Sequence, residues 1–189
     1  IMKVIKNYLY NLSYQILTII LPIITVPYVT RIFTSEALGN YIFYNSIVSY
    51  FSLFAMLGIG VYGTKQIAAA SDVSSTFWNI YAIQLIASIL AIAVYLIVAF
   101  SIPQMSGVIP LIVGITLFAN MMDISWLFSG KEDFKKITIR NIVVRLIGVI
   151  SIFTFVKSSD DLYLYVFLIV IFDLFHYFYH HCYYGYASK

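Results

Sequence analysis

Charged residues are scarce in this chain. Asp, Glu, Lys and Arg make up only 10% of its 189 residues, whereas 62% of the residues are hydrophobic. About a quarter of the residues of a typical soluble domain are charged, and the mean hydropathy of +0.93 lies far above the soluble range. The scarcity of charge therefore excludes an ordinary soluble domain and indicates an integral membrane protein.

Cysteine and long polar connections are also scarce. The single Cys182 excludes an intrachain disulfide. The segments between the apolar runs are short and leave no room for a soluble catalytic domain. We therefore expect a protein that is not an enzyme and uses no cofactor, with its functional residues inside the apolar runs or at their ends.

Long apolar runs fill most of the chain and predict an all-α, polytopic membrane protein. A helix crosses the hydrocarbon core with roughly 20 apolar residues, and about six such runs fit. The predicted spans are residues 8–30, 41–63, 78–100, 107–129, 138–157 and 161–181. The second and fourth are the least regular, because glycines and polar residues interrupt them. The first is too long for a cleaved signal peptide, so we expect it to remain as a span.

The distribution of Lys and Arg predicts the orientation, because positively charged connections stay in the cytoplasm. An N-terminus inside the cell places most of these residues on the inner side: Lys3, Lys6, Lys65, Lys131, Lys135, Lys136, Arg140 and Lys189. Arg31 and Lys157 then lie outside. We expect both termini in the cytoplasm, with Trp78 and Trp126 at the inner headgroup level. The net charge of +3 reflects this topology and gives no support to a nucleic-acid partner.

Polar residues recur along one side of most predicted spans. Taken span by span, these stripes are Asn7, Asn11, Gln15 and Thr18; Tyr41, Asn45, Ser49 and Ser52; Tyr81, Gln84, Ser88 and Tyr95; Thr116, Asn120 and Asp123; and Asn141, Arg145 and Gly148. Spacings of three and four residues place each stripe on one helix face. A single stripe of this kind commonly mediates helix packing. Five stripes that include ionisable groups favour a hydrated cavity for a large polar substrate.

Two prolines and three arginines are candidates for function within this pattern. Pro22 and Pro27 each remove a backbone donor from the first span, and they predict either a fixed kink or a bending point. Arg31 and Arg140 are expected near the membrane surface, where they suit anionic headgroups. Arg145 lies deeper and either binds an anion in the cavity or extends toward the inner surface.

Asp123 is the acidic counterpart of Arg145, near the end of the preceding predicted span, residues 107–129. Its carboxylate is expected either to pair with such an arginine or a loop lysine, or to couple transport to a proton or cation. The sequence leaves these roles open.

The end of the chain, residues 172–189, departs from the aliphatic pattern before it. Asp173, His176 and His180 share a helix face and Cys182 is close, which is a pattern that a metal site uses. An abrupt change of composition also arises where a natural reading frame is lost. We favour a truncated or frame-shifted end over a metal centre.

Several stretches together resemble a known family. These are "NYLYN" at residues 7–11, "PYVTR" at residues 27–31, the Gly39 to Tyr41 element, and "DISWLFSGKEDFKKITIRN" at residues 123–141. They are similar to bacterial polysaccharide repeat-unit flippases of the Wzx type, within the multidrug/oligosaccharidyl-lipid/polysaccharide exporter superfamily. The resemblance covers about residues 1–170.

The resemblance implies a twelve-helix transporter of two lobes, of which residues 1–181 form the first. Such a transporter moves undecaprenyl-diphosphate-linked oligosaccharide to the outer leaflet of the bacterial cytoplasmic membrane by alternating access, for O-antigen, capsule or exopolysaccharide synthesis. The implied partners are this lipid-linked oligosaccharide, the bilayer, a second lobe or a second copy of the chain, and polysaccharide polymerase and chain-length proteins.

The resemblance and the chemistry of the residues give specific roles. We expect Arg145, with Arg140, to engage the diphosphate. The expected lining of the sugar path and cavity is Asn11, Gln15, Arg31, Asn45 and Asn120. The alternatives are an ion-coupled exporter of drugs or small molecules, or a membrane glycosyltransferase or polymerase that uses Glu132 and Asp133, or Asp160 and Asp161.

Overall fold

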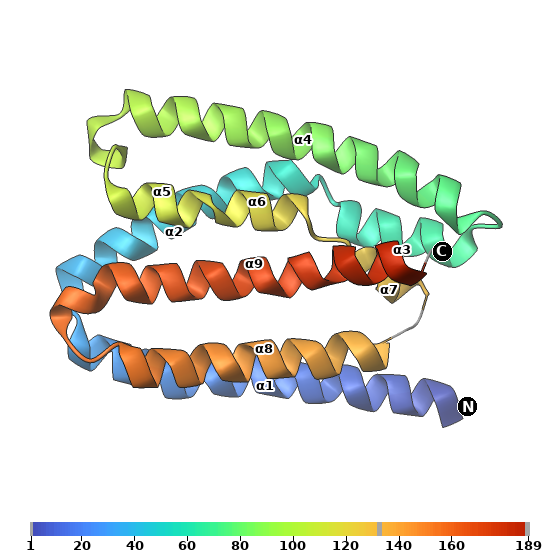
Figure 1. Cartoon of the computed structure of the whole chain (residues 1–189), viewed down its shortest axis with the longest axis horizontal. Helices are drawn as coiled ribbons and strands as arrows, with labels where there is room; N and C mark the ends of the chain where they lie inside the picture. The colour runs from blue at the N-terminus through green and yellow to red at the C-terminus, as the bar shows by residue number, and fades with distance from the viewer. Residues whose placement is uncertain (1, 132–133, 188–189) are drawn as a thin grey trace.

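The structure is a computed structural model that describes residues 2–131 and 134–187, with side chains described for residues 9–10, 12–131, 138–139 and 141–175. Within these ranges every regular element is helical, which confirms the all-α class. The long helices lie side by side, and the first and last described residues lie at the same end of the molecule (Figure 1).

Each predicted span corresponds to one helix or to a chain of helices. The long helices are α1 (Met2–Ile32), α2 (Ser35–Met56), α4 (Val73–Ser101), α8 (Phe134–Phe155) and α9 (Leu162–Ala187). The shorter elements are α3 (Ile59–Ala69), η1 (Pro103–Met105), α5 (Val108–Gly114), α6 (Thr116–Met121), α7 (Ser125–Gly130) and η2 (Ser159–Asp161).

Length and apolar composition suit several described segments for crossing a membrane. They are Leu12–Ile32, Ser35–Ala69, Val73–Ser101 and Val108–Gly130, and a shorter apolar helix covers Asn141–Phe155. Large apolar side chains such as Ile83, Leu90 and Ile97 face outward from α4, as lipid contact requires. The chain is therefore a multi-pass membrane protein, and the number of about six spans stays a prediction.

The second and fourth predicted spans are broken helices. α2 ends at Met56, and both Leu57 (φ 43°) and Gly58 (φ 72°) adopt the left-handed conformation before α3 begins. Glycine enters this region without strain, whereas leucine does so at a cost. In the fourth span, α6 ends at Met121 and α7 begins only at Ser125. The sequence predicted that these segments span the membrane but did not predict where they break.

The helices pack in a continuous sequence of contacts. α2 packs on α4, both contact α6, and α3 packs on α7. On the other side of the molecule, α9 contacts α5, α6 and α8, and α8 contacts α1. Three buried apolar clusters fill these interfaces: one among α3, α4 and α7, one among α2, α4, α5, α6 and α9, and one among α1, α8 and α9.

Glycine allows α3 and α7 to approach closely. A Cβ atom built on Gly63 would lie 2.6 Å from Cε3 of Trp126, and one built on Gly130 would lie 2.7 Å from Cβ of Ile67. The indole of Trp126 is only 1% exposed and stacks on the ring of Phe77 at 5.5 Å. The Trp126 ring is therefore packed inside the bundle, and the headgroup level expected for the two tryptophans stays a prediction. The Trp78 ring is 58% exposed.

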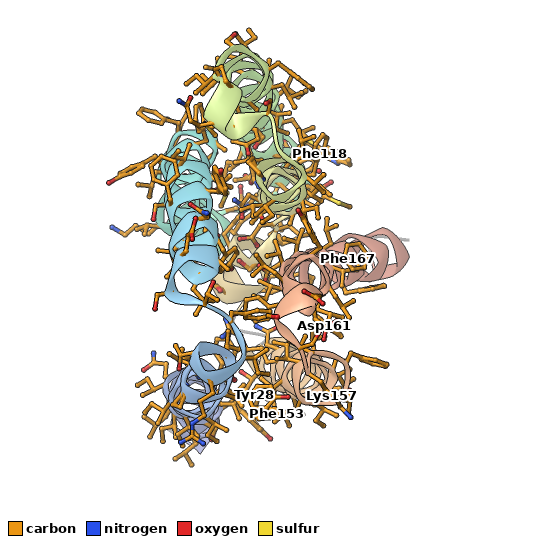
Figure 2. All side chains as sticks on the ribbon, turned by 90° about the vertical axis from the view of Figure 1, so that its left-hand side faces the viewer. Tyr28, Phe118, Phe153, Lys157, Asp161 and Phe167 are labelled. Atoms are coloured by element: carbon orange, nitrogen blue, oxygen red, sulfur yellow. The ribbon has the colours of Figure 1, made fainter. Side chains whose placement is uncertain are left out.

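The turn between α8 and α9 also anchors the end of α1. The Tyr28 hydroxyl of α1 donates a 2.7 Å hydrogen bond to the Val156 carbonyl, and the Tyr28 and Phe153 rings lie 4.3 Å apart (Figure 2). In the turn, the Asp161 carboxylate accepts hydrogen bonds from the backbone N–H groups of Lys157 (2.9 Å) and Ser158 (2.8 Å). These two bonds hold the pKa of Asp161 below its ordinary value.

Substitution of Gly63 by alanine is expected to destabilise the bundle by about 1–3 kcal/mol, because the added methyl group overlaps the Trp126 ring. Gly60 is a matched control on the same helix, since nothing lies within 4 Å of a Cβ at that position. Gly60→Ala should be neutral or slightly stabilising. Thermal unfolding of the purified variants in detergent measures both effects, and equal stability of the two variants would contradict the close packing.

Asp161→Ala is expected to lower stability at neutral pH, because the turn loses the acceptor for two backbone donors. Since the pKa of Asp161 is lowered from its ordinary value of 3.8 in the folded state, its contribution is present above pH 3.8 and is lost as the pH falls through the folded-state pKa. The difference in melting temperature between wild type and variant should therefore shrink below pH 3.8. Asp160→Ala serves as the neighbouring control, and a pH-independent difference would refute the assignment.

Candidate functional site

A groove of about 320 Å³ opens between α1, α8 and α9. It is lined by Leu21, Pro22, Thr25 and Val26 from α1, by Arg145, Gly148, Val149 and Ile152 from α8, and by Tyr165, Leu168, Ile169, Phe172 and Asp173 from α9. Most of this lining is apolar. Among the lining residues, Arg145 and Asp173 alone carry full charges, so they dominate the electrostatics of the groove.

These two charges lie at one level along the bundle. Arg145 is ten residues before the end of α8 at Phe155, and Asp173 is eleven residues after the start of α9 at Leu162. Because a helix rises 1.5 Å per residue, both lie about 15–17 Å from the intervening turn, or half of a hydrocarbon core of about 30 Å. Pro22 lies ten residues before the end of α1, which the Tyr28 bond fixes to the same turn.

Arg145 contacts α1 and shares the groove with a carboxylate of α9. Its Cζ atom lies 5.5 Å from the centroid of the Tyr14 ring on α1, a cation–π geometry. Asp173 of α9 lines the same groove. Both charged side chains remain accessible in the groove. The arrangement thus offers a guanidinium to an anion that enters the groove, with one carboxylate beside it.

The structure brings only part of the predicted site together. Arg145 and Pro22 line the groove. The predicted residues that are exposed elsewhere on α1 and α2 are Gln15, Pro27, Arg31 and Asn45. The side chains of Asn11 and Arg140 lie outside the described part of the chain. The functional roles of all these residues stay predictions.

Asn120 and Asp123 lie apart from the groove, at the break between α6 and α7 in the fourth predicted span. The Asn120 amide donates a 2.7 Å hydrogen bond to the Ser52 hydroxyl of α2. The Asp123 carboxylate accepts a 2.9 Å bond from the Ser125 N–H and so caps the start of α7. Both side chains have structural contacts at these positions.

Gln84 of α4 lies at the centre of this break and is fully buried. Its side-chain amide nitrogen lies 3.0 Å from the Asn120 carbonyl, 3.4 Å from that of Met121 and 2.8 Å from that of Asp123. Its amide oxygen accepts a 3.0 Å bond from the Trp126 indole. Because an indole N–H only donates, this contact fixes which way the amide points.

The stripe of Tyr81, Gln84, Ser88 and Tyr95 therefore lies in the protein interior, where all four side chains are buried. The Tyr95 hydroxyl likewise donates to a backbone carbonyl, that of Pro110, at 2.6 Å. The stripe of this span therefore packs against the neighbouring helices and does not line a cavity.

The residues considered for a metal site are only partly described. Asp173 lies in the groove, and the side chains of His176, His180 and Cys182 lie outside the described part of the chain. Within the described residues, no group of three His, Cys, Asp or Glu side chains is placed to hold a metal ion.

Comparison with known proteins identifies the family. The family described as "Polysaccharide biosynthesis protein" matches residues 4–186. The chain belongs to this family. The match includes most of the 172–189 segment that the composition sets apart.

Two relatives in this family share the name "Putative O-antigen transporter". The one from Escherichia coli (strain K12) is 26% identical over 168 residues, which cover 83% of this chain and 39% of the relative. The one from Shigella dysenteriae is 27% identical over 145 residues, which cover 75% of this chain and 37% of the relative. The chain thus spans about two fifths of the length of these relatives. No solved structure matches it significantly.

Gln84→Leu is expected to destabilise the fold by about 1–3 kcal/mol, because it removes one hydrogen-bond partner from the Trp126 indole and one from the Asp123 carbonyl at the helix break. Asn79→Leu is the matched control, since it removes an exposed amide from the same helix. Unfolding in detergent measures the loss, and hydrogen exchange should show faster opening of α7 in the Gln84 variant alone. An unchanged melting temperature would argue against this role of Gln84.

Proposed function

We propose that the chain is part of a flippase that moves undecaprenyl-diphosphate-linked oligosaccharide repeat units from the cytoplasmic to the outer leaflet during surface polysaccharide synthesis. Membership of the polysaccharide biosynthesis family and the names of the two transporter relatives support this class of substrate. The observation that carries the proposal is the groove between α1, α8 and α9, which Arg145 lines.

The position of Arg145 suits a lipid-linked diphosphate. Placing a charge near the bilayer centre costs at least about 2.5–3.5 kcal/mol on insertion scales, so a deep arginine needs an anion or another polar partner to offset this cost. A guanidinium forms paired, charge-assisted hydrogen bonds with phosphate oxygens. The apolar lining of the groove suits lipid on either side of such a contact, and the polyprenyl chain itself can remain in the bilayer.

The exposed amides of Gln15 on α1 and Asn45 on α2 would serve the sugar part of the substrate. Sugars present many hydroxyls, which amide side chains bond as donors and acceptors. Pro22 lies in the groove wall, so bending of α1 at this residue would change the width of the groove directly. Alternating access requires such a movement.

A second wall is needed to enclose a large polar head, and the chain spans only about two fifths of its relatives. In the proposal, a second lobe or a second copy of the chain supplies that wall. The protein acts without covalent chemistry, in the bacterial cytoplasmic membrane with both described ends on the cytoplasmic side. Polysaccharide polymerase and chain-length proteins would receive the product.

Arg145→Ala in the full-length gene is expected to reduce surface polysaccharide by about 10- to 100-fold in a strain that lacks its own flippase, the range expected for loss of a charged hydrogen bond. Arg145→Lys should retain part of the activity, because the charge remains without the paired geometry. Lys157→Ala, which removes an exposed cation at the α8–α9 turn, serves as the control. Normal polysaccharide levels with Arg145→Ala, at equal protein abundance in the membrane, would sink the proposal.

A further inference from the structure

Asp173 is a charged residue of the groove that the proposed function does not use. It lines the same groove as Arg145, at the same level on the neighbouring helix. The other acidic side chain considered deep in the membrane, Asp123, caps α7 at the helix break. Asp173 is thus the one acidic residue among those that line the groove.

We propose that Asp173 neutralises Arg145 while the groove is empty, and that it makes the groove selective for lipids with a diphosphate over lipids with a single phosphodiester. This inference rests on the proposed function. An incoming phosphate group must replace the carboxylate as the counter-ion of Arg145. The anion that enters therefore competes with Asp173 for one guanidinium.

The charge of the competing group decides the outcome of this competition. A phosphodiester headgroup such as that of phosphatidylglycerol carries one negative charge, the same as the carboxylate. Such a headgroup gains little binding free energy by displacing the Asp173 carboxylate, which α9 already holds in place. A diphosphate carries more negative charge and more acceptor oxygens, so it binds the guanidinium more strongly than the carboxylate does.

Without Asp173, an arginine at mid-membrane would attract any anionic lipid. Such lipids greatly outnumber a biosynthetic intermediate in a bacterial membrane, so occupation of the groove by them would block transport. The repulsion between Asp173 and a bound diphosphate also weakens the substrate complex, because like charges in a medium of low dielectric repel strongly. Release at the end of the cycle then becomes faster.

The other polar groups of the groove cannot replace Asp173 in this role. The Thr25 hydroxyl donates to the Leu21 carbonyl at 2.8 Å within its own helix. Tyr165 packs edge-on against the Tyr41 ring, with centroids 5.7 Å apart, and is a neutral phenol. Neither group offsets the charge of a guanidinium.

The test uses the purified chain in phosphatidylcholine nanodiscs, with and without phosphatidylglycerol, and farnesyl diphosphate as the probe. In pure phosphatidylcholine, Asp173→Asn is expected to bind the probe about 3- to 30-fold more tightly than wild type, because one repelling charge is removed. Phosphatidylglycerol should then weaken binding to this variant and leave wild-type binding almost unchanged. Asp173→Glu, which retains the charge, should behave like wild type.

Two controls separate selectivity from structural damage. Asp160→Asn removes the same charge at the α8–α9 turn, outside the groove, and should leave both affinities unchanged. The double variant Arg145→Ala with Asp173→Asn should bind the probe much more weakly than Asp173→Asn alone, because it lacks the guanidinium that holds the diphosphate. If Asp173→Asn unfolds in thermal scans, Asp173→Ser provides a second neutral variant for the same titration.

The outcomes distinguish this inference from the proposed function. Binding that depends on Arg145 but has the same affinity and the same sensitivity to phosphatidylglycerol in wild type and Asp173→Asn would overturn the role of Asp173 alone. Absence of probe binding in wild type and in every variant would contradict both the inference and the diphosphate step of the proposed function.

Discussion

The side-chain amide of Gln84 satisfies backbone groups that the membrane cannot. Between α6 and α7 the chain leaves its helical hydrogen-bond pattern, and free carbonyls in hydrocarbon cost several kcal/mol each. The side-chain amide nitrogen of Gln84, on the unbroken helix α4, lies within 3.4 Å of three carbonyls at this break, and the amide is itself oriented by the Trp126 indole. The close packing of α3 on α7, with Trp126 against Gly63, depends on this junction because the indole is common to both.

The polar side chains of the molecule form two groups: those that bond one another inside the bundle and those that remain accessible in the groove. Around Gln84, donors and acceptors bond one another inside the bundle, and the Asn120–Ser52 bond extends this arrangement to α2. In the groove of α1, α8 and α9, the charges of Arg145 and Asp173 are accessible and influence each other without being enclosed. The residues around Gln84 specify the fold, whereas Arg145 and Asp173 can exchange their partners. A substrate site requires side chains that can exchange partners in this way.

The sequence predicted the segments that form the helices because hydropathy over about 20 residues is a strong signal. It marked the second and fourth segments as irregular but could not locate the breaks, of which the one between α6 and α7 is bonded by Gln84 of another helix. It also could not distinguish a stripe that faces the interior from one that faces a cavity, since both have the same spacing. The proximity of Arg145 and Asp173 was predictable in principle, because they lie at nearly equal distances from a short turn. The position of α1, which forms the third wall of the groove, was not predictable, because nothing in the local sequence positions Pro22 beside α8.

The length of α4 fixes the depth of the Gln84 junction. Its 29 residues span about 43 Å, which exceeds a hydrocarbon core of about 30 Å, so at least one end must reach the headgroup region or the helix must tilt. The polar first turn, capped by Asp72, and the exposed ring of Trp78 suit the headgroup region. Gln84 follows Trp78 by six residues and thus lies about 9 Å deeper. The interrupted backbone therefore lies in the outer part of the hydrocarbon, where its carbonyls still need the hydrogen-bond partner that Gln84 supplies.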